Sequence, residues 1–259
     1  MLFASGAVSF VLTFFKKRRN SMLKISGLVK RYGEKCAVDR LDLHIKAGEI
    51  YAFIGHNGAG KTTTIKACMG ILSFDEGEIL IDGLSIKKSP LECKRKMAYI
   101  PDNPDLYDFL TGISYLNFIA DVYGVSADER NKRISELSEK LGLKSNLANK
   151  ISSYSHGMKQ KLAVIAAWLH DPKLIIMDEP FVGLDPKASH VLKEMMREHC
   201  DKGGSIFFST HVLDVAEKIC DSVAIIKDGR LVTSGKMEEV RGDSSLESVF
   251  LELEDNNDE

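Results

Sequence analysis

The sequence has no apolar stretch long enough to cross a membrane and no excess of charge of either sign. Its apolar N-terminal segment, Leu2 to Phe15, is interrupted by small polar residues and glycine and is shorter than the roughly 20 residues of a transmembrane helix. Lys and Arg number 35 and Asp and Glu 37, which gives a formal net charge of -2. These features exclude a multi-span membrane protein and any bulk attraction to nucleic acid, although a local basic patch is compatible with them.

Cysteine is also scarce, and its pattern excludes two further classes. The five cysteines are odd in number and lack C-x-x-C spacing: Cys36, Cys68, Cys93, Cys200 and Cys220. They indicate neither a disulfide framework nor a zinc site and favour a reducing compartment. Hydrophobic residues make up 44% and charged residues 28%, which excludes a mostly disordered or collagen-like chain. A chain of 259 residues is long enough for one elaborated domain or a domain with a subdomain.

Residues 1–21 differ in character from the rest. Their apolar segment precedes the basic run Lys16 to Arg19, whereas a secretory signal carries its positive charge before the apolar part. One interpretation is a membrane-surface anchor, because basic residues favour anionic lipid. We favour the other, an upstream extension outside the domain, because the regular pattern begins at Met22. The domain is therefore expected to span residues 22–259.

Short apolar segments separated by turn residues predict strands in the first third of the chain. Residues 41–45 alternate with period two, whereas residues 50–54 form a continuous apolar run, which is typical of a strand buried on both faces. Residues 61–72 are helix formers, and residues 78–83 read as a strand closed by an Asp-Gly turn.

The middle of the chain, about residues 111–149, has the pattern of helices. Ser126 and Glu129 form a capping-box pattern. Strand patterns at residues 174–177, 205–209 and 223–226 follow, with a helical stretch at 187–201 between the first two. This alternation predicts an α/β fold with a buried, largely parallel sheet. A helical block, about residues 102–170, is then an insertion in that sheet domain.

A phosphate-binding loop is predicted between the strand at 50–54 and the helix after it. The segment Gly55-His56-Asn57-Gly58-Ala59-Gly60-Lys61-Thr62 fits G-x-x-x-x-G-K-[ST] and is followed by Thr63. Glycines let successive N–H groups point at phosphate oxygens, and the helix adds its partial positive charge. Lys61 is expected to reach the β- and γ-phosphates, and the Thr62 hydroxyl to ligate Mg²⁺. A glycine-rich turn without a ligand is the alternative, and the strand and helix on either side disfavour it.

A second element suits metal binding and water activation. The apolar run at 174–177 ends in Asp178 and Glu179. Asp178 is placed to hold the metal through its water shell, and Glu179 to polarise an attacking water. Acids at strand ends are common, so the phosphate loop upstream is what makes this pair informative.

From about Leu23 to Leu253, the chain resembles the ATP-binding cassette (ABC) ATPases. Three further segments carry the resemblance: Tyr154 to Gln160 is similar to the signature motif, Gly183 to Pro186 to the D-loop, and His211 after Ser209-Thr210 to the switch histidine. Tyr32 precedes the phosphate loop as the adenine-stacking aromatic does in that family.

The resemblance implies a fold and a mechanism. The fold is a P-loop NTPase core with a mainly parallel sheet, an N-terminal antiparallel β subdomain and an inserted α-helical subdomain. ATP and Mg²⁺ would bind between two cassettes stacked head-to-tail as a homodimer or heterodimer. Ser155 and Gly157 of one cassette would approach the γ-phosphate of the ATP bound by the other. His211 would contact the same phosphate and help to orient the attacking water, and Asp185 of the D-loop is an expected nucleotide contact. Closure and opening of this pair would drive a partner.

Two departures from the family pattern concern the site. His156 and Met158 replace the third and fifth residues of the usual Leu-Ser-Gly-Gly-Gln signature. Asp102 stands after Tyr99-Ile100-Pro101, where the family usually has glutamine. Aspartate can still face Mg²⁺, but as an anion it cannot donate a hydrogen bond. We therefore include Asp102 among the expected metal and nucleotide contacts.

A single cassette without membrane spans implies, if it is a transporter, a separate multi-span permease and a location at the cytoplasmic face of the membrane. Residues 102–123 are the expected docking surface, because Leu106, Tyr107, Phe109 and Leu110 cluster there; packing within the helical block is the alternative. Residues 245–253 resemble the end of exporter ATPases. Competing hypotheses are a soluble ABC ATPase acting on ribosomes, DNA or iron–sulfur assembly, and a small-molecule kinase. We favour the exporter and expect no nucleic-acid partner.

Overall fold

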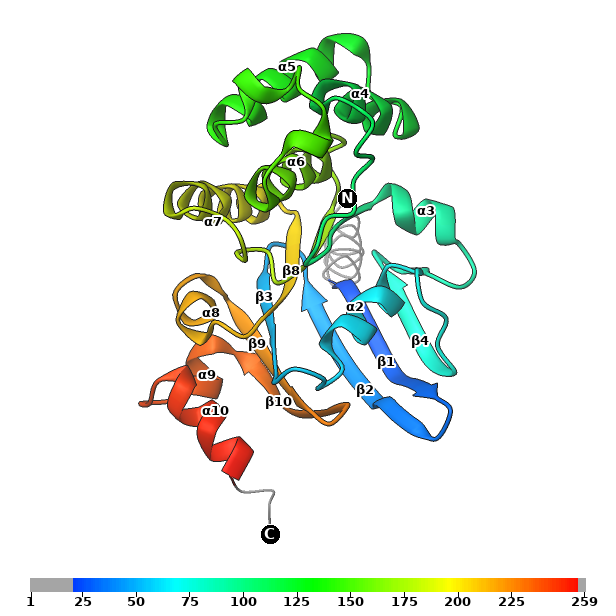
Figure 1. Cartoon of the computed structure of the whole chain (residues 1–259). Coiled ribbons are helices and arrows are strands. Elements are labelled where there is room, and N and C mark those ends of the chain that lie inside the picture. Colours follow the sequence, from blue (N-terminus) through cyan, green and yellow to red (C-terminus); the bar gives the residue numbers. More distant parts are fainter. Residues whose placement is uncertain (1–20, 256–259) are drawn as a thin grey trace, which may run out of the picture.

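Two sheets form the centre of the molecule (Figure 1). The structure is a computed structural model and describes residues 21–255. The first sheet has the order β2-β1-β4-β5 and is antiparallel throughout. Its strands are β1 (Ser21–Tyr32), β2 (Lys35–Lys46), β4 (Glu76–Ile81) and β5 (Leu84–Ser85). The predicted N-terminal antiparallel subdomain is confirmed.

The second sheet is the predicted parallel one. Its order is β10-β9-β3-β8-β7-β6, and every neighbouring pair is parallel except β10 with β9. The strands are β3 (Ile50–Ile54), β6 (Met97–Ile100), β7 (Leu174–Asp178), β8 (Ser205–Thr210), β9 (Ser222–Lys227) and β10 (Arg230–Lys236). Consecutive parallel neighbours are far apart in sequence, as crossover connections require.

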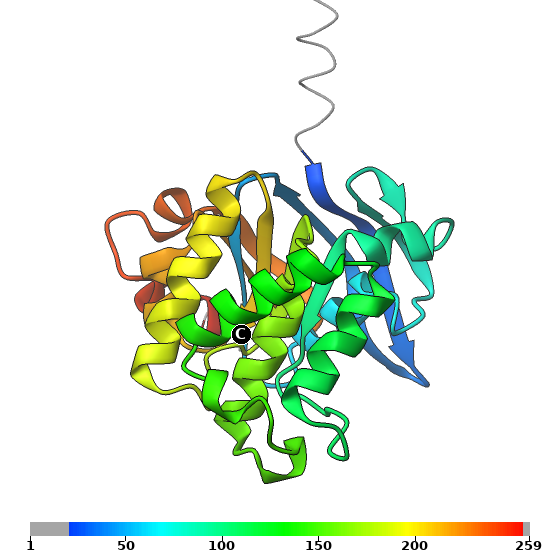
Figure 2. The ribbon, with the colours of Figure 1, turned by 90° about the horizontal axis from the view of Figure 1, so that it is seen from above.

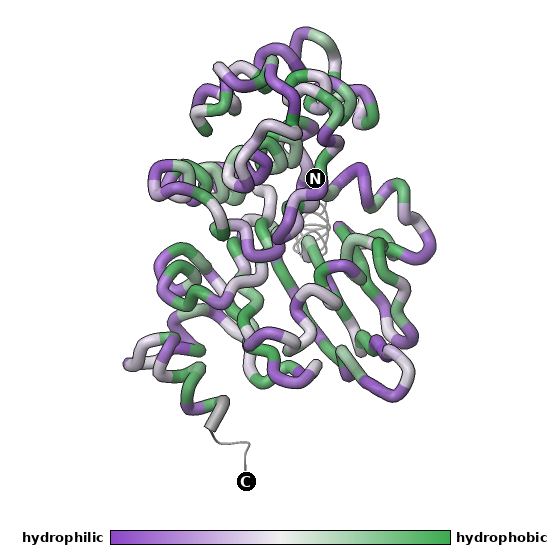
Figure 3. The backbone as a smooth tube through the Cα atoms, viewed as in Figure 1, coloured by the Kyte–Doolittle hydropathy of each residue, from purple (hydrophilic) through white to green (hydrophobic). Residues whose placement is uncertain are grey.

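Side-chain alternation along β3 separates two cores. Ile50, Ala52 and Ile54 pack into the core shared with the helices, whereas Tyr51 and Phe53 pack into the core shared with the antiparallel sheet. Every residue of β3 is therefore buried, which explains its continuous apolar run. In the view coloured by hydropathy, the central strands are mainly hydrophobic and the outer turns mainly hydrophilic (Figure 3).

Helices surround the parallel sheet, and three of them form the inserted block (Figures 1 and 2). The helical block consists of α4 (Gly112–Val122), α5 (Ala127–Lys140) and α6 (His156–Trp168), with 3₁₀ turns at Lys144–Asn146 and Ile151–Ser153. The others are α2 (Lys61–Cys68), α3 (Pro90–Arg95), α7 (Pro186–Asp201), α8 (Leu213–Ile219), α9 (Met237–Arg241) and α10 (Leu246–Asp255). Ser126 caps α5 by accepting a hydrogen bond from the Glu129 N–H at 3.4 Å. This is the Ser126 half of the expected capping box, and the Glu129 carboxylate accepts from Arg133 Nε at 2.6 Å.

Several predicted boundaries shift. The helix expected over residues 61–72 ends at Cys68, because Gly70 adopts the left-handed conformation (φ 61°) that terminates a helix. The strand expected at 78–83 covers 76–81 and ends at the Asp82-Gly83 turn. Of the expected extension, Ser21 lies in β1 and pairs with Lys46, and residues 1–20 lie outside the described residues. Within residues 21–255 no helix has the length and apolar character of a membrane span.

At Gly77 in β4, the backbone lies close to that of β1, and this approach leaves no room for a side chain. The φ of Gly77 is +94°, and a Cβ added there would lie 2.5 Å from the carbonyl oxygen of Gly27. Gly83 also has a positive φ (+79°) but faces open space. We expect Gly83→Ala to cost about 1–2 kcal/mol through its backbone conformation alone. Gly77→Ala should cost about 1–3 kcal/mol more, because the β1–β4 pairing must also shift. Denaturant unfolding of both variants measures the difference, and equal losses would contradict this account.

Candidate functional site

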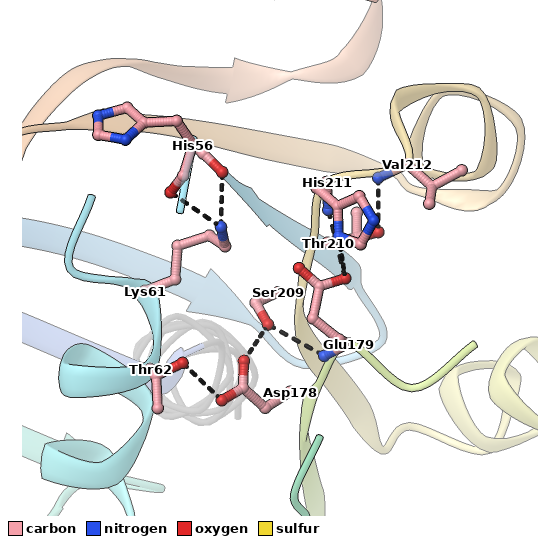
Figure 4. A network of polar contacts seen from close by, with 10 residues as sticks. His56, Lys61, Thr62, Asp178, Glu179, Ser209, Thr210, His211 and Val212 are labelled. Atoms are coloured by element: carbon pink, nitrogen blue, oxygen red, sulfur yellow. Dashed lines mark hydrogen bonds and ion pairs between the residues drawn. The ribbon is translucent and has the colours of Figure 1, made fainter. Parts of the chain in front are cut away.

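The carboxyl ends of three neighbouring parallel strands meet at one edge of the second sheet. β3 leads into the loop at residues 55–60, β7 ends at Asp178, and β8 ends at Thr210 just before His211. This edge is where open α/β sheets bind their ligands. Figure 4 shows the polar side chains that converge there.

The loop after β3 is shaped by its glycines and by its neighbours. Gly58 and Gly60 have φ values of +86° and +108°, a region that only glycine enters without strain. A Cβ on Gly60 would lie 2.5 Å from the Ala37 carbonyl oxygen, and one on Gly55 would lie 2.4 Å from the Ile226 carbonyl oxygen. The loop is thus wedged between β2 and β9, and its curvature is fixed by packing as well as by turn geometry.

Lys61, the first residue of α2, turns back into this loop. Its Nζ donates to the carbonyl oxygens of Gly55 (2.5 Å) and His56 (3.2 Å), and the residue is only 7% exposed. Burial lowers the pKa of the ammonium, while the nearby carboxylates of Glu179 and Asp178 act against that shift. A buried cation with neutral carbonyl partners suits a polyanionic ligand, because phosphate oxygens would offset the cost of its desolvation.

Asp178 is the most deeply buried acid of the cluster, at 3% exposed. The Thr62 hydroxyl donates to its Oδ2 at 2.7 Å, and the Ser209 hydroxyl donates to its Oδ1 at 2.5 Å. Ser209 Oγ in turn accepts from the Glu179 N–H at 3.1 Å. Sequence reasoning missed Ser209. The available signal was the polar pair Ser209-Thr210 that follows the apolar run at residues 206–208 of β8.

Glu179 has an unusual backbone and a specific side-chain partner. Its φ is +49°, which is uncommon for a residue other than glycine and is often found at functional sites. Its Oε2 lies 2.9 Å from His211 Nδ1 and accepts from the His211 N–H at 3.3 Å. The structure thus brings together the two residues that the sequence predicted to act on the attacking water.

A cavity of about 340 Å³ opens beside this cluster. The predicted residues that line it are Tyr32, Asn57, Gly58, Gly60, Lys61, Thr62, Thr63, Asp102, Asp178 and Glu179, and Lys35 and Ala37 join them. Tyr32 is half exposed, with Lys30 Nζ 5.2 Å from its ring centroid. The predicted residues Gly55, His56, Ala59 and His211 are not in the lining. The His56 ring lies 3.6 Å from Asp228, and Gly55 and Ala59 are buried.

Ser155, Gly157 and Asp185 lie away from this cavity in the same chain. Ser155 caps α6 by accepting from the Met158 N–H at 3.2 Å. Asp185 caps α7 through the Ala188 N–H at 2.8 Å and pairs with Lys161 Nζ at 2.7 Å, which holds its pKa below the usual range. The structure therefore does not bring these three residues to the phosphate loop of their own chain.

Gly157 has a packing role that the sequence did not reveal. A Cβ added there would lie 2.5 Å from the carbonyl oxygen of Gly183. Gly183 itself has φ +77°, and a Cβ there would lie 2.3 Å from the His156 ring. The two glycines allow the start of α6 and the segment before α7 to pack together.

The oxygen donors fit a small divalent cation that is also held by phosphate. Among the described side chains, those of residues 21–253, no group of three from His, Cys, Asp or Glu is arranged to hold a metal ion by itself. Thr62, Asp178 and Asp102 line one cavity and offer hard oxygen atoms. Mg²⁺ typically binds one or two carboxylates together with substrate phosphates and water.

The comparisons with known proteins agree with this geometry. The family profile described as "ABC transporter" matches residues 38–182. The linearmycin resistance ATP-binding protein LnrL of Bacillus subtilis is 35% identical over 83% of this chain and 69% of its own length. The ABC-type transporter ATP-binding protein EcsA of the same organism is 34% identical over 90% of this chain and 96% of its own length. A solved ATP-binding subunit of an ABC transporter superposes with a TM-score of 0.87 at 37% identity, covering 90% of this chain and all of that one.

The fold and the cluster at the strand ends define a P-loop ATPase of the ATP-binding cassette type. The chain belongs to the ABC transporter family. The predicted fold class and ATPase class are thereby confirmed.

Ser209 and Ser205 form a matched pair on β8. Both are fully buried, and each hydroxyl donates one hydrogen bond and accepts another; Ser205 donates to the Lys46 carbonyl and accepts from the Gly48 N–H. We expect either alanine variant to lose about 1–3 kcal/mol of stability. Only Ser209→Ala should also lower ATP hydrolysis, by roughly 10- to 100-fold, because Asp178 and the Glu179 backbone lose their shared partner. Unfolding curves and ATPase rates of both variants test this, and normal hydrolysis by Ser209→Ala would contradict it.

Proposed function

We propose that this chain is the ATP-binding and ATP-hydrolysing subunit of an exporter, acting on a separate membrane permease at the cytoplasmic face. The observation that carries the proposal is the convergence of Lys61, the Thr62–Asp178–Ser209 network and the Glu179–His211 pair on one cavity. A cation, a metal-ligand set and a carboxylate–imidazole pair are the parts that phosphoryl transfer to water needs.

The cavity supplies a place for each part of ATP. Tyr32 offers a half-exposed ring on which adenine would stack. The N–H groups of Gly58 and of residues 60–63 and the ammonium of Lys61 would bind the phosphates. Thr62, Asp178 and Asp102 would hold Mg²⁺, which neutralises charge on the phosphate oxygens when bound.

Glu179 is the proposed general base. Its carboxylate is largely buried beside the cavity, and it would take a proton from the attacking water. His211 contacts the same carboxylate through both Nδ1 and its backbone N–H. This double contact fixes the direction in which the carboxylate points, so His211 would orient the base.

A second cassette would complete the site. Ser155 and Asp185 are exposed and lie outside the cavity of their own chain. Ser155 and the Gly157 N–H stand at the N-terminus of α6, a helix end that favours anions. In a head-to-tail pair, these groups would approach the γ-phosphate bound by the other chain.

Glu179→Gln tests the base and the pairing together. The amide keeps the size of the carboxylate but neither its basicity nor its charge. We expect hydrolysis to fall by about 10²–10⁴-fold, while Lys61, Thr62 and Asp178 still bind ATP. Loss of one anion beside the γ-phosphate should also favour closure. Gel filtration should therefore show a dimer with ATP and Mg²⁺ but not with ADP. Near-normal hydrolysis would show that Glu179 is not the base.

An exposed aromatic cluster supports docking on a permease. The Tyr107 ring centroid lies 5.9 Å from those of Phe109 and Phe118. All three side chains are exposed, and Phe109 is 75% exposed. Leu106 and Leu110 pack against the core instead, so of the four apolar residues on which this surface was predicted only Tyr107 and Phe109 are exposed. Solvent-exposed aromatic clusters are typical of protein interfaces. The direction of transport is proposed by analogy with LnrL, whose name records linearmycin resistance.

Phe109→Ser tests this docking surface. We expect the variant to recover much less of a multi-span membrane protein in co-purification than the wild type, because Phe109 supplies exposed apolar area in the cluster. Leu251→Ser is the matched control, since Leu251 is an exposed apolar residue on the distant helix α10. ATP hydrolysis by the isolated chain should be unchanged in both. Equal recovery by both variants would argue against this surface, and no membrane protein with the wild type would favour an ABC ATPase without a transport role.

A further inference from the structure

A basic surface with exposed apolar residues lies around helix α3 and is not used by the proposed ATPase mechanism. We call it the α3 patch. It consists of Lys66 near the end of α2, Ile71 after it, and Lys88, Leu91, Lys94 and Arg95 at α3, all of which are exposed. Residues 86–96 contain five basic residues and one acidic residue, although the whole chain has a net charge of -2.

The four cations of the α3 patch are free to act on a partner. Among the side chains of residues 21–253, the part of the chain whose side chains the structure describes, no carboxylate pairs with Lys66, Lys88, Lys94 or Arg95. Their neighbours are used differently: Lys96 forms an ion pair with Asp82 at 2.7 Å, and Lys87 lies 3.8 Å from the centroid of the Phe74 ring. The local positive charge is therefore uncompensated, apart from the exposed Glu92.

Apolar side chains lie within this positive surface. Leu91 is 72% exposed and Ile71 is 58% exposed. Leu91, Lys94 and Arg95 share one face of α3 by their i, i+3 and i+4 spacing. The aliphatic stem of Lys94 runs beside Gly70, 3.9 Å from a Cβ built there, so the α2 and α3 parts of the patch are contiguous. Exposed apolar residues flanked by cations match the chemistry of an anionic membrane surface, where apolar tips enter the interface and cations meet headgroups.

We propose that the α3 patch binds anionic lipid headgroups at the membrane surface. The inference rests on the proposed function in one respect, namely that the permease brings the chain to the membrane. Figure 1 places α3 between β4 and α4, and α4 carries Phe118 of the aromatic cluster. A membrane suits this surface better than nucleic acid does, because a nucleic acid would meet the cations but would leave Leu91 and Ile71 without apolar contacts.

Vesicle binding by the full chain tests the proposal. The probes are phosphatidylcholine vesicles with and without phosphatidylglycerol, in co-sedimentation at low and at high salt. Each cation contributes on the order of fivefold to partition onto an anionic surface. We expect the variant with Lys66, Lys88, Lys94 and Arg95 all changed to Gln to lose at least about tenfold in binding to the anionic vesicles. Leu91→Ser should weaken binding by a larger factor at high salt than at low salt, because salt screens the charges while the apolar contact persists.

The matched control changes four exposed lysines outside the patch, Lys24, Lys132, Lys202 and Lys218, to Gln, which alters net charge equally. Both variants retain residues 1–20, so a difference between them isolates the patch. Equal binding by both, or a preference for DNA over anionic vesicles that depends on the patch, would overturn the proposal. ATP hydrolysis should be unchanged in both variants. Absence of hydrolysis in the wild type would count against the proposed function and not against the patch.

Discussion

The buried carboxylate of Asp178 is the constraint on which the rest of the site depends. At 3% exposed, an ionised carboxylate without partners would cost several kcal/mol, so its two oxygens need donors. Those donors come from two other elements: Thr62 on α2 and Ser209 on β8. One side chain on β7 therefore sets the distance between the start of α2 and the ends of two strands. The phosphate loop joins β3 to α2. The hydrogen bond between Thr62 and Asp178 fixes where α2 begins, and it therefore constrains the shape of the loop.

The same network also places the residue that follows. Ser209 Oγ donates to Asp178 and accepts from the Glu179 N–H, while the Ser209 carbonyl accepts from that N–H as well, at 3.2 Å. Glu179 is thereby held at φ +49°, a conformation that costs energy for a residue with a Cβ and persists only where the surroundings enforce it. Its carboxylate then faces His211. Lys61 lies near both acids, so the site balances a buried cation against two carboxylates before any phosphate is present.

Features that depend on neighbours in the sequence were predictable, and features that depend on distant contacts were not. The loop from Gly55 to Thr62 and the Asp178-Glu179 pair are local patterns, and the burial of β3 follows from its apolar run. Ser209 escaped prediction because its importance comes from strand pairing: β8 lies beside β7 in the sheet, and Ser209 pairs with Asp178 there. The end of α2 at Cys68 was missed because residues 69–72 are compatible with a helix, and only the conformation of Gly70 stops it.

Gly157 shows that one residue can satisfy two independent requirements. The resemblance to ABC ATPases predicts that its N–H faces a phosphate, and the packing requires glycine because the Gly183 carbonyl lies against its Cα. Two more contacts join the same elements: Gln160 Nε2 donates to the Pro180 carbonyl at 3.3 Å, and Lys161 pairs with Asp185. Residues 180–185 are therefore attached to α6 along their whole length. Because Pro180 directly follows Glu179, the start of α6 cannot shift far without displacing the chain that carries this carboxylate. Substitutions at Gly157 would consequently disturb the chain's own cavity as well as the surface it offers to a second cassette.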